Sequence, residues 1–314
     1  MPTARAAPAG PGPASGLSLH ARQFRALGCE NEIQLYAESD DAAQRMLQAG
    51  VDEARRIEAK FSRYLDDSVT SAINRAAGVS PVGIDEETAS LLDYADACYR
   101  LSGGLFDVTS GVLRRIWNFR DGTVPGASAI AAVLPLIGWS GVERKDGKIL
   151  LPRPGMEIDF GGIGKEYCAD RVAGTLLDAG ALHGFVNLGG DIRVLGPHPG
   201  GEPWAIGIRH PRAAQRMLVT IRIGSGALAT SGDYERYFEI DGRRYCHVLN
   251  PRTGFPVSGM QSVSVVAPLC TVAGSVCTIA MLKEGDAREF LEAQGFAYLA
   301  VDGAGRMHGA LARL

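Results

Sequence analysis

The segment IDFGGIGKE at residues 158–166 constrains the fold of this chain more than any other feature. The apolar alternation at 156–160 predicts a strand, and the pattern from Lys165 to Ala179 predicts a helix that Gly180 ends. Three glycines between them leave the first backbone amides of the helix accessible, which is typical of a phosphate or diphosphate site. The spacing matches neither the Walker A motif nor GxGxxG. A purely structural glycine-rich connection fits these residues equally well.

The remaining hydrophobic pattern predicts helices first, then consecutive strands, then helices again, which indicates an α+β fold. The predicted helices cover residues 41–63, 86–101, 126–137, 165–179, 271–283 and 286–294. The predicted strands cover residues 30–37, 148–152, 156–160, 184–195, 204–209, 217–223, 226–230, 234–240, 243–249, 261–267, 297–301 and 306–312. Ser39 and Asp85 are the expected N-caps of the first two helices.

Composition excludes several classes of protein. A net charge of -3 over 314 residues gives no electrostatic reason to expect nucleic acid as a partner. The six cysteines lack CxxC spacing, so a disulfide framework or structural zinc site is not expected. Residues 1–20 are rich in Ala, Pro and Gly without an apolar core, which predicts a disordered tail rather than a signal peptide or membrane span. We therefore expect a cytoplasmic protein with one domain over residues 21–314.

Three further segments have turn-forming residues that are able to line a ligand site. They are Asn187–Asp191 (NLGGD), Gly226–Tyr234 (GALATSGDY) and His247–Gly254 (HVLNPRTG). Each by itself is more often a turn than a site. His247 is a candidate for proton transfer, although a single histidine on a strand is usually structural.

Taken together, these segments resemble the FAD:protein FMN transferases of the ApbE type. IDFGGIGKEYCADR, NLGGDIRVLG, ATSGDYERYF and HVLNPRTGFP occur in that family's order, after FSRYLDDSVTSAIN at 61–74 and GGLFDVTSG at 103–111. The resemblance extends from about Phe24 to the C-terminus. It implies an ApbE-type, T-fold-like α+β fold with mixed or antiparallel sheets flanked by helices and FAD in a central cleft. It also implies cleavage of FAD, transfer of FMN to a Ser or Thr of an acceptor flavoprotein, and release of AMP, with Mg²⁺ at the diphosphate.

The same resemblance assigns roles to individual residues. His247 is implied to accept the proton of the attacking hydroxyl, and the backbone carbonyl of Gly162 and the hydroxyl of Thr278 to bind the metal. The residues implied to contact FAD are Tyr64, Leu105, Phe106, Asp107, Asp159, Lys165 and Leu249.

The chain departs from the family's pattern at the metal. Gly274 stands where the family commonly has a metal-binding Asp, one helical turn before Thr278. Cys277 stands where some members have a second acid, Asn250 replaces an Asp in the His-containing turn, and Leu27-Gly28-Cys29 replaces Met-Gly-Thr. Mg²⁺ prefers carboxylate oxygens, so the site should be weakened.

Two alternatives to an FMN transferase therefore stay open: a non-catalytic FAD-binding protein and an FAD diphosphatase that transfers FMN to water. From the sequence, Gly274→Asp is expected to restore the missing ligand and to stabilise its helix slightly. The alternative outcome is a clash and lower activity, if the glycine is there to let another ligand or the diphosphate approach closely.

Overall fold

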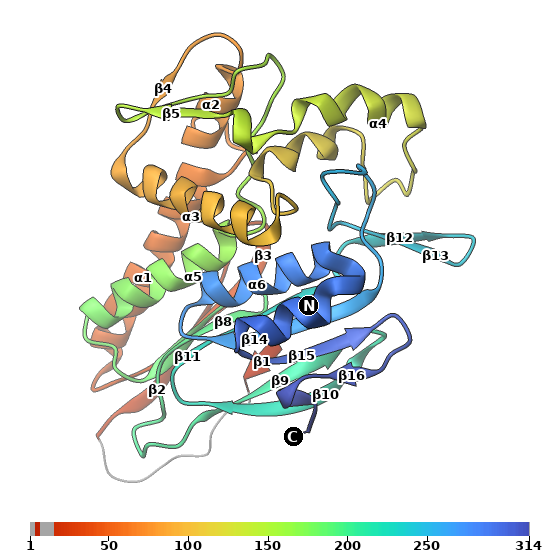
Figure 1. Ribbon diagram of the computed structural model, residues 1–314. Coiled ribbons are helices and arrows are strands. Elements are labelled where there is room, and N and C mark those ends of the chain that lie inside the picture. The colour runs from red at the N-terminus through yellow and green to blue at the C-terminus, as the bar shows by residue number, and fades with distance from the viewer. Residues whose placement is uncertain (1–3, 7–15, 314) are drawn as a thin grey trace.

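A single antiparallel sheet forms the middle layer of the molecule in the computed structural model, which describes residues 4–6 and 16–313 (Figure 1). Its strands are β2 (Ser18–Ala26), β3 (Cys29–Ala37), β7 (Gly184–Leu188), β8 (Asp191–Gly196), β11 (Gly226–Gly232), β14 (Met260–Ala267), β15 (Ala297–Asp302) and β16 (Met307–His308). Their order across the sheet is β16-β15-β14-β11-β8-β7-β3-β2, and every neighbouring pair is antiparallel.

Three helices cover one face of this sheet: α1 (Asp40–Phe61), α5 (Gly164–Asp178) and α6 (Cys270–Lys283) (Figure 1). Helix α1 begins after Ser39, whose hydroxyl accepts from the amide of Ala42, as predicted for an N-cap. Its apolar stripe, which includes Leu47, Val51 and Ile57, is buried. Helix α6 is buried nearly all round, because α5, the sheet and α7 (Ala287–Gln294) enclose it.

A smaller sheet covers the opposite face. It contains β9 (Trp204–His210) between β1 (Ala4–Ala6) and β10 (Ala213–Ile223). Trp204 is fully buried in this layer and its ring lies 4.9 Å from that of Phe185 on β7, in an edge-to-face arrangement. The large sheet is therefore buried on both faces.

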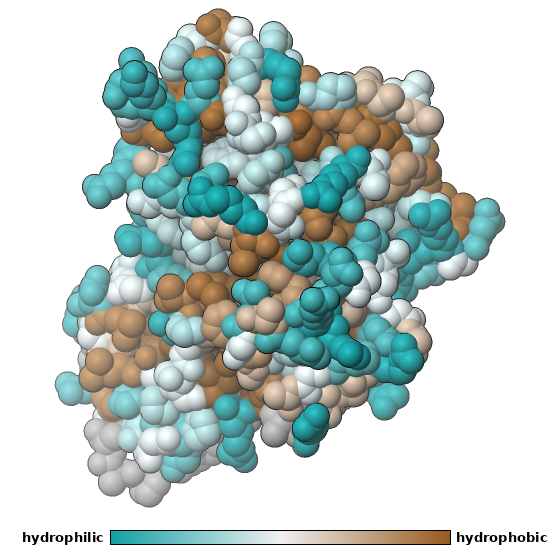
Figure 2. All heavy atoms as spheres, viewed as in Figure 1, coloured by the Kyte–Doolittle hydropathy of each residue, from teal (hydrophilic) through white to brown (hydrophobic). Residues whose placement is uncertain are grey.

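The other elements lie beyond the helical layer. They are α2 (Val69–Arg75), β4 (Val82–Gly83), α3 (Glu86–Ser102), the 3₁₀ segment Val108–Arg115, α4 (Ala127–Val133), β5 (Glu143–Lys145), β6 (Lys148–Leu150), and the hairpin of β12 (Tyr237–Ile240) and β13 (Arg243–Cys246) (Figure 1). Asp85 caps α3, as predicted, and Gly103 ends it in a left-handed conformation. Apolar surface gathers over α4 in Figure 2, because this helix turns Ile130 and Val133 inward and leaves Ala131 and Ala132 exposed.

The predicted α+β class is confirmed, and the differences are local. The strand predicted at 184–195 is a hairpin, because Gly189 and Gly190 have positive φ and turn the chain between β7 and β8. Helix α4 is shorter than predicted, because a 3₁₀ turn containing Pro135 follows Val133. The strand predicted at 306–312 is only the two residues of β16, followed by a 3₁₀ turn.

The N-terminal stretch holds elements for which the sequence had no clear signal. Strand β1 and the start of β2 lie inside the predicted tail of residues 1–20, whereas residues 1–3 and 7–15 of that tail lie outside the described residues. All six cysteines are free, as expected. Within residues 4–6 and 16–313, no helix combines the length and apolar character needed to cross a membrane.

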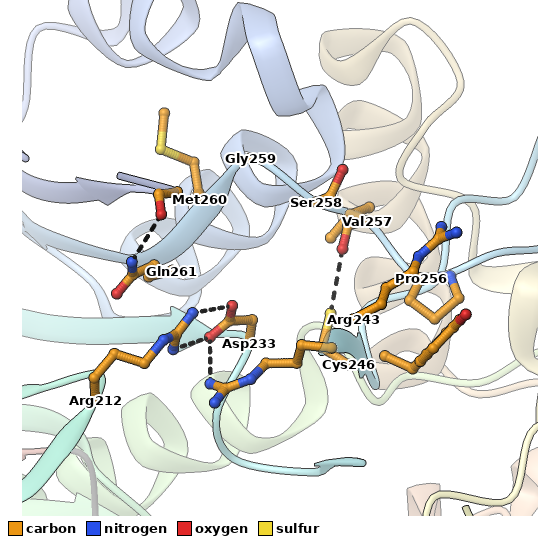
Figure 3. Close-up of a pocket in the computed structure, with 13 residues that line it drawn as sticks. Arg212, Asp233, Arg243, Cys246, Pro256, Val257, Ser258, Gly259, Met260 and Gln261 are labelled. Carbon is orange, nitrogen blue, oxygen red and sulfur yellow. Dashed lines mark hydrogen bonds and ion pairs between the residues drawn. The ribbon is translucent and has the colours of Figure 1, made fainter. Parts of the chain in front are cut away.

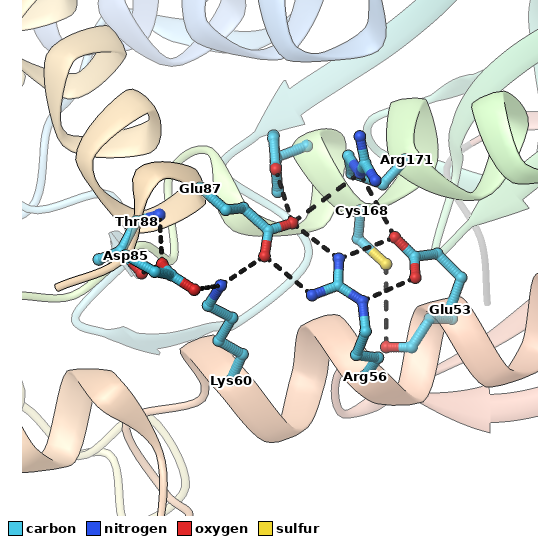
Figure 4. Close-up of polar contacts among 10 residues, drawn as sticks. Glu53, Arg56, Lys60, Asp85, Glu87, Thr88, Cys168 and Arg171 are labelled. Atoms are coloured by element: carbon cyan, nitrogen blue, oxygen red, sulfur yellow. Dashed lines mark hydrogen bonds and ion pairs between the residues drawn. The ribbon is translucent and has the colours of Figure 1, made fainter.

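A network of charged side chains joins α1, α3 and α5 at the surface (Figure 4). Glu87 of α3 accepts hydrogen bonds from Arg56 of α1 at 2.7 Å and from the hydroxyl of Tyr167 of α5 at 2.9 Å, and it also pairs with Lys60. The hydrogen bonds from Arg56 are the main reason why the pKa of Glu87 is lowered. The network thereby fixes the orientation of the helix that carries the glycine-rich segment.

Glu87→Gln is expected to lower the free energy of unfolding by about 1–2 kcal/mol at pH 7, because it removes the charge that Arg56 and Lys60 share. The stabilisation is present above the ordinary carboxyl pKa of 4.5 and is lost as the pH falls through the lowered pKa of Glu87. Urea denaturation at pH 7 and pH 4 measures both effects. Glu143→Gln on the exposed strand β5 is the control, and an equal loss in both variants would contradict the structural role of Glu87.

Candidate active site

The predicted glycine turn lies where an extended segment enters helix α5. Residues 156–160 are not the strand that the sequence predicted: Ile158 exchanges two backbone hydrogen bonds with the side-chain amide of Asn74, and the Asp159 amide donates to the carbonyl of Val108. A side chain and a 3₁₀ segment thus take the place of a neighbouring strand. The amides of Ile163 and Gly164 donate to the carbonyl of Phe160. Helix α5 begins without a side-chain cap, so the amides that follow Gly164 are available to a ligand.

Close packing explains the glycine at position 162. A Cβ atom there would lie 3.0 Å from the ring of Phe106 and 3.9 Å from the Cγ2 atom of Thr278. The Thr278 hydroxyl in turn lies 3.2 Å from that of Ser231 on β11. The structure thus brings Gly162, Phe106 and Thr278, which are far apart in the sequence, to one place.

Lys165 forms an ion pair with Asp191, the first residue of β8. Asp191 is only 1% exposed, and its other carboxylate oxygen accepts from the Thr230 amide at 3.2 Å. Burial alone would lower the pKa of Lys165, but Asp191 and Glu166 raise it above its usual range. Lys165 is therefore cationic, and its partly exposed side chain is placed beside the glycine turn.

Asp159 is held by two arginines. Its carboxylate lies 3.2 Å from Arg63 and 3.3 Å from Arg114, and it also accepts from the Gly161 amide at 2.8 Å. A Cβ atom on Gly161 would lie 3.1 Å from this carboxylate. Asp159 therefore orients the glycine turn and holds two cations at its entrance, whichever part of a ligand it meets.

His247 lies directly after β13, with its backbone amide donating to the carbonyl of Arg236 at 2.9 Å. Its Nδ1 atom is buried and has no hydrogen-bond partner among the described residues. Burial, together with the positive charges of Arg114, Arg236 and Lys165, lowers the pKa of His247 to about 3. The imidazole is therefore neutral at pH 7 and able to accept a proton.

Glu166 is the buried acid of the site. It is 7% exposed, and its Oε2 atom has no hydrogen-bond partner among the described residues. Burial and the neighbouring carboxylate of Asp191 raise the pKa of Glu166. A Cβ atom on Gly274 of α6 would lie only 2.4 Å from its Cγ atom and 2.8 Å from its Oε1 atom. The Glu166 side chain thus occupies the space beside Gly274.

The remaining residues predicted to contact FAD differ in their exposure and in their contacts. Tyr64 is 75% exposed and has the Arg63 guanidinium 5.9 Å from its ring centre. Phe106 is buried and Leu105 half-buried beside it. Asp107 caps the 3₁₀ segment, and its carboxylate accepts from the amides of Thr109 and Trp139 at 2.7 and 3.1 Å. Leu249 packs in a cluster around Trp117. Asp107 and Leu249 therefore have structural contacts of their own.

The pocket in Figure 3, with a volume of about 310 Å³, lies beside this centre rather than in it. Asp233 pairs there with Arg212 and Arg244, at 2.6 and 3.4 Å. The lining includes Cys246, directly before His247, but none of the predicted site residues. It is therefore not the predicted FAD cleft.

Comparison with known proteins identifies the relatives of this chain. The sequence profile of the ApbE family matches residues 27–300. The chain belongs to the ApbE family. An FAD:protein FMN transferase of Klebsiella pneumoniae is 34% identical over 241 residues, 75% of this chain and 73% of the relative. The ApbE protein of Thermotoga maritima has a TM-score of 0.86 at 34% identity, covering 93% of this chain and 97% of that one. The flavin transferase ApbE of Vibrio cholerae has a TM-score of 0.83 at 25% identity, covering 94% and 98%.

Three departures from the ApbE pattern have local explanations. The side-chain oxygen of Asn250 accepts from the Arg252 amide at 2.9 Å, a bond that an Asp would also accept, so the turn after His247 is kept. Cys277 is fully buried, and its thiol lies 3.3 Å from the carbonyl of Ala229, so it packs between α6 and β11. A third departure, Leu27-Gly28, forms the turn between β2 and β3 with both residues at positive φ.

Gly274→Asp requires the Glu166 side chain to move, because a Cβ atom at 274 would lie 2.4 Å from the Glu166 Cγ atom. The benefit expected from the sequence stays a prediction. Sequence reasoning missed Glu166 and the arginines that hold Asp159. One signal for Glu166 was present: a glycine inside a predicted helix, which usually marks close approach of another group.

Proposed function

We propose that this chain is an FAD:protein FMN transferase. The observation that carries the proposal is the half-buried His247, whose Nδ1 atom has no hydrogen-bond partner among the described residues, within a chain that matches the ApbE family over residues 27–300. Burial and the nearby positive charges of Arg114 and Lys165 keep its imidazole neutral. These cations lie at the entrance of the glycine turn, where a diphosphate is able to bind the first amides of α5. Relatives named FAD:protein FMN transferase support the same activity.

Each part of the reaction has a residue in this proposal. The acceptor hydroxyl loses its proton to His247 while its oxygen bonds to the phosphorus of the FMN half of FAD. The bond from that phosphorus to the bridging oxygen breaks, and AMP leaves with the oxygen. Lys165 and Arg114 provide positive charge toward the diphosphate, and the amides of the glycine turn orient it. Tyr64, exposed beside Arg63, is placed to stack on a ring of FAD.

We also propose a Mg²⁺ ion at this site. Among the described residues no group of three or more His, Cys, Asp or Glu side chains is arranged to hold a metal by itself. Mg²⁺ needs fewer protein ligands than this, since it commonly binds one or two carboxylates together with substrate phosphates and water. The Gly162 carbonyl, the Thr278 hydroxyl and the unpartnered Oε2 of Glu166 fit such an ion. When bound, the ion neutralises charge on the diphosphate.

The test is to incubate the purified chain with FAD, Mg²⁺ and a Thr-containing acceptor flavoprotein. We expect AMP release in step with flavin fluorescence that stays on the acceptor in a denaturing gel. AMP release without acceptor labelling would instead favour the diphosphatase, and FAD binding without AMP would favour a non-catalytic member. FAD should bind more tightly than FMN, because Lys165 and Asp159 are assigned to the diphosphate and adenylate side. The cytoplasmic location expected from the sequence stays a prediction.

A further inference from the structure

The carboxylate of Glu166 and the missing side chain of Gly274 are complementary. A Cβ atom built on Gly274 would lie 2.4 Å from Cγ, 2.9 Å from Cδ and 2.8 Å from Oε1 of Glu166. An aspartate side chain at 274 would therefore overlap the Glu166 side chain, starting at its Cβ atom. The Glu166 carboxyl group therefore occupies the volume of the acid that α6 lacks.

The spacing of residues 274 and 278 along α6 also suits two ligands of one metal ion. Residues 274 and 278 are about one turn apart on the same face of the helix, about 6 Å along its axis. Thr278 meets Gly162 and Ser231 at the other end of that turn. A carboxylate that projects from α5 at Gly274 thus lies on the same face as the Thr278 hydroxyl.

The charges around Glu166 favour a cation. Glu166 and Asp191 are 7% and 1% exposed, and Lys165 is the ammonium group paired with Asp191. Two buried carboxylates therefore share one ammonium group. Because the Oε2 atom of Glu166 is buried and unpartnered in the described part of the chain, ionised Glu166 needs a further positive group to offset its burial.

We propose that Glu166 is the carboxylate ligand of the metal ion in this chain, projecting from α5 in place of the acid that the family usually has on α6. The inference rests on the proposed function, because it assumes a metal ion at the FAD diphosphate. If Glu166 binds the metal, Gly274 no longer indicates an inactive member of the ApbE family. The ligand is present, but it comes from another helix.

Manganese is a suitable probe, since Mn²⁺ accepts the same oxygen ligands as Mg²⁺ and is followed by electron paramagnetic resonance. We expect Glu166→Gln to weaken FAD-dependent Mn²⁺ binding at least about tenfold, because a charged ligand is lost. Without metal, the same variant should melt close to the wild-type temperature, because the amide has nearly the size and shape of the carboxyl group and burial already disfavours the charged form of Glu166. A merely structural role for Glu166 would instead lower the melting temperature and leave Mn²⁺ affinity unchanged.

Two variants of the glycine give an independent check. Gly274→Ala is expected to weaken Mn²⁺ binding, because its methyl group displaces the Glu166 side chain. The double variant Glu166→Gly, Gly274→Asp moves the carboxylate to α6 and should bind Mn²⁺ better than Glu166→Gly alone. The control is Glu143→Gln, which should behave as the wild type.

The outcomes separate the two proposals. If the wild type releases AMP and binds Mn²⁺, but Glu166→Gln binds Mn²⁺ as tightly, the assignment of Glu166 is wrong and the transferase stands. If the wild type neither binds Mn²⁺ with FAD nor releases AMP, the proposed function fails and the assignment of Glu166 fails with it. Weaker binding in Glu166→Gln together with recovery in the double variant supports the assignment.

Discussion

His247→Gln is expected to slow FMN transfer by about 10²–10⁴-fold, the usual contribution of a positioned general base. FAD binding should be nearly unchanged, because the diphosphate is assigned to the glycine turn and Lys165. Single-turnover AMP release and FAD titration measure the two effects separately. The control is His20→Gln on the edge strand β2, and the assignment fails if both histidine variants keep wild-type turnover.

The same variant should change the pH dependence of stability. The pKa of His247 is lowered to about 3 from an ordinary 6.5, so the unfolded chain binds a proton that the folded chain does not. Stability due to the neutral ring is therefore complete above pH 6.5 and is lost as the pH falls toward 3. Between pH 7 and pH 5, the wild type should lose about 1–2 kcal/mol more than His247→Gln in urea denaturation.

Lys165→Met is expected to lower both the free energy of unfolding and the affinity for FAD. It leaves the carboxylate of Asp191, 1% exposed, without its cation. Removing one partner of a buried pair typically costs about 3 kcal/mol or more. FAD affinity should fall as well, because the charge assigned to the diphosphate is lost.

The double variant Lys165→Met, Asp191→Asn separates these effects. The neutral amide introduced at position 191 no longer needs a cation, and its side-chain oxygen is still able to accept from the Thr230 amide. We therefore expect most of the stability to return while FAD affinity stays low. Urea denaturation and flavin fluorescence titration provide the two measurements. A single variant that keeps both stability and FAD affinity would show that the pair has neither role.

Where a motif is local, the sequence predicted the segment that the structure places in the candidate site. The three glycines, Lys165 and His247 each belong to a short segment with its own pattern, and the structure places these segments together. The caps at Ser39 and Asp85 were predictable for the same reason, since a cap depends on residues within one turn. The sequence wrongly predicted a strand at 156–160, because buried Met156, Ile158 and Phe160 alternate in any extended segment packed on one side.

Contacts between distant segments could not be predicted in this way. Arg63 reaches Asp159 across 96 positions in the chain, and Gly274 meets Glu166 only because α5 and α6 pack side by side. Gly274 considered alone indicates a lost ligand. Only the packing of the two helices shows that its empty space is filled by an acid from elsewhere.

The fit between Glu166 and Gly274 also constrains how such a chain evolves. A glutamate gained at 166 beside an aspartate at 274 would crowd two acids into one volume, whereas a glycine gained at 274 first would leave no acid at all. Either order passes through an impaired ancestor, so the two positions are expected to change together across a lineage. Members of the family should then divide into two groups, one with the acid on each helix. A search that requires the acid at position 274 would discard one group of working enzymes.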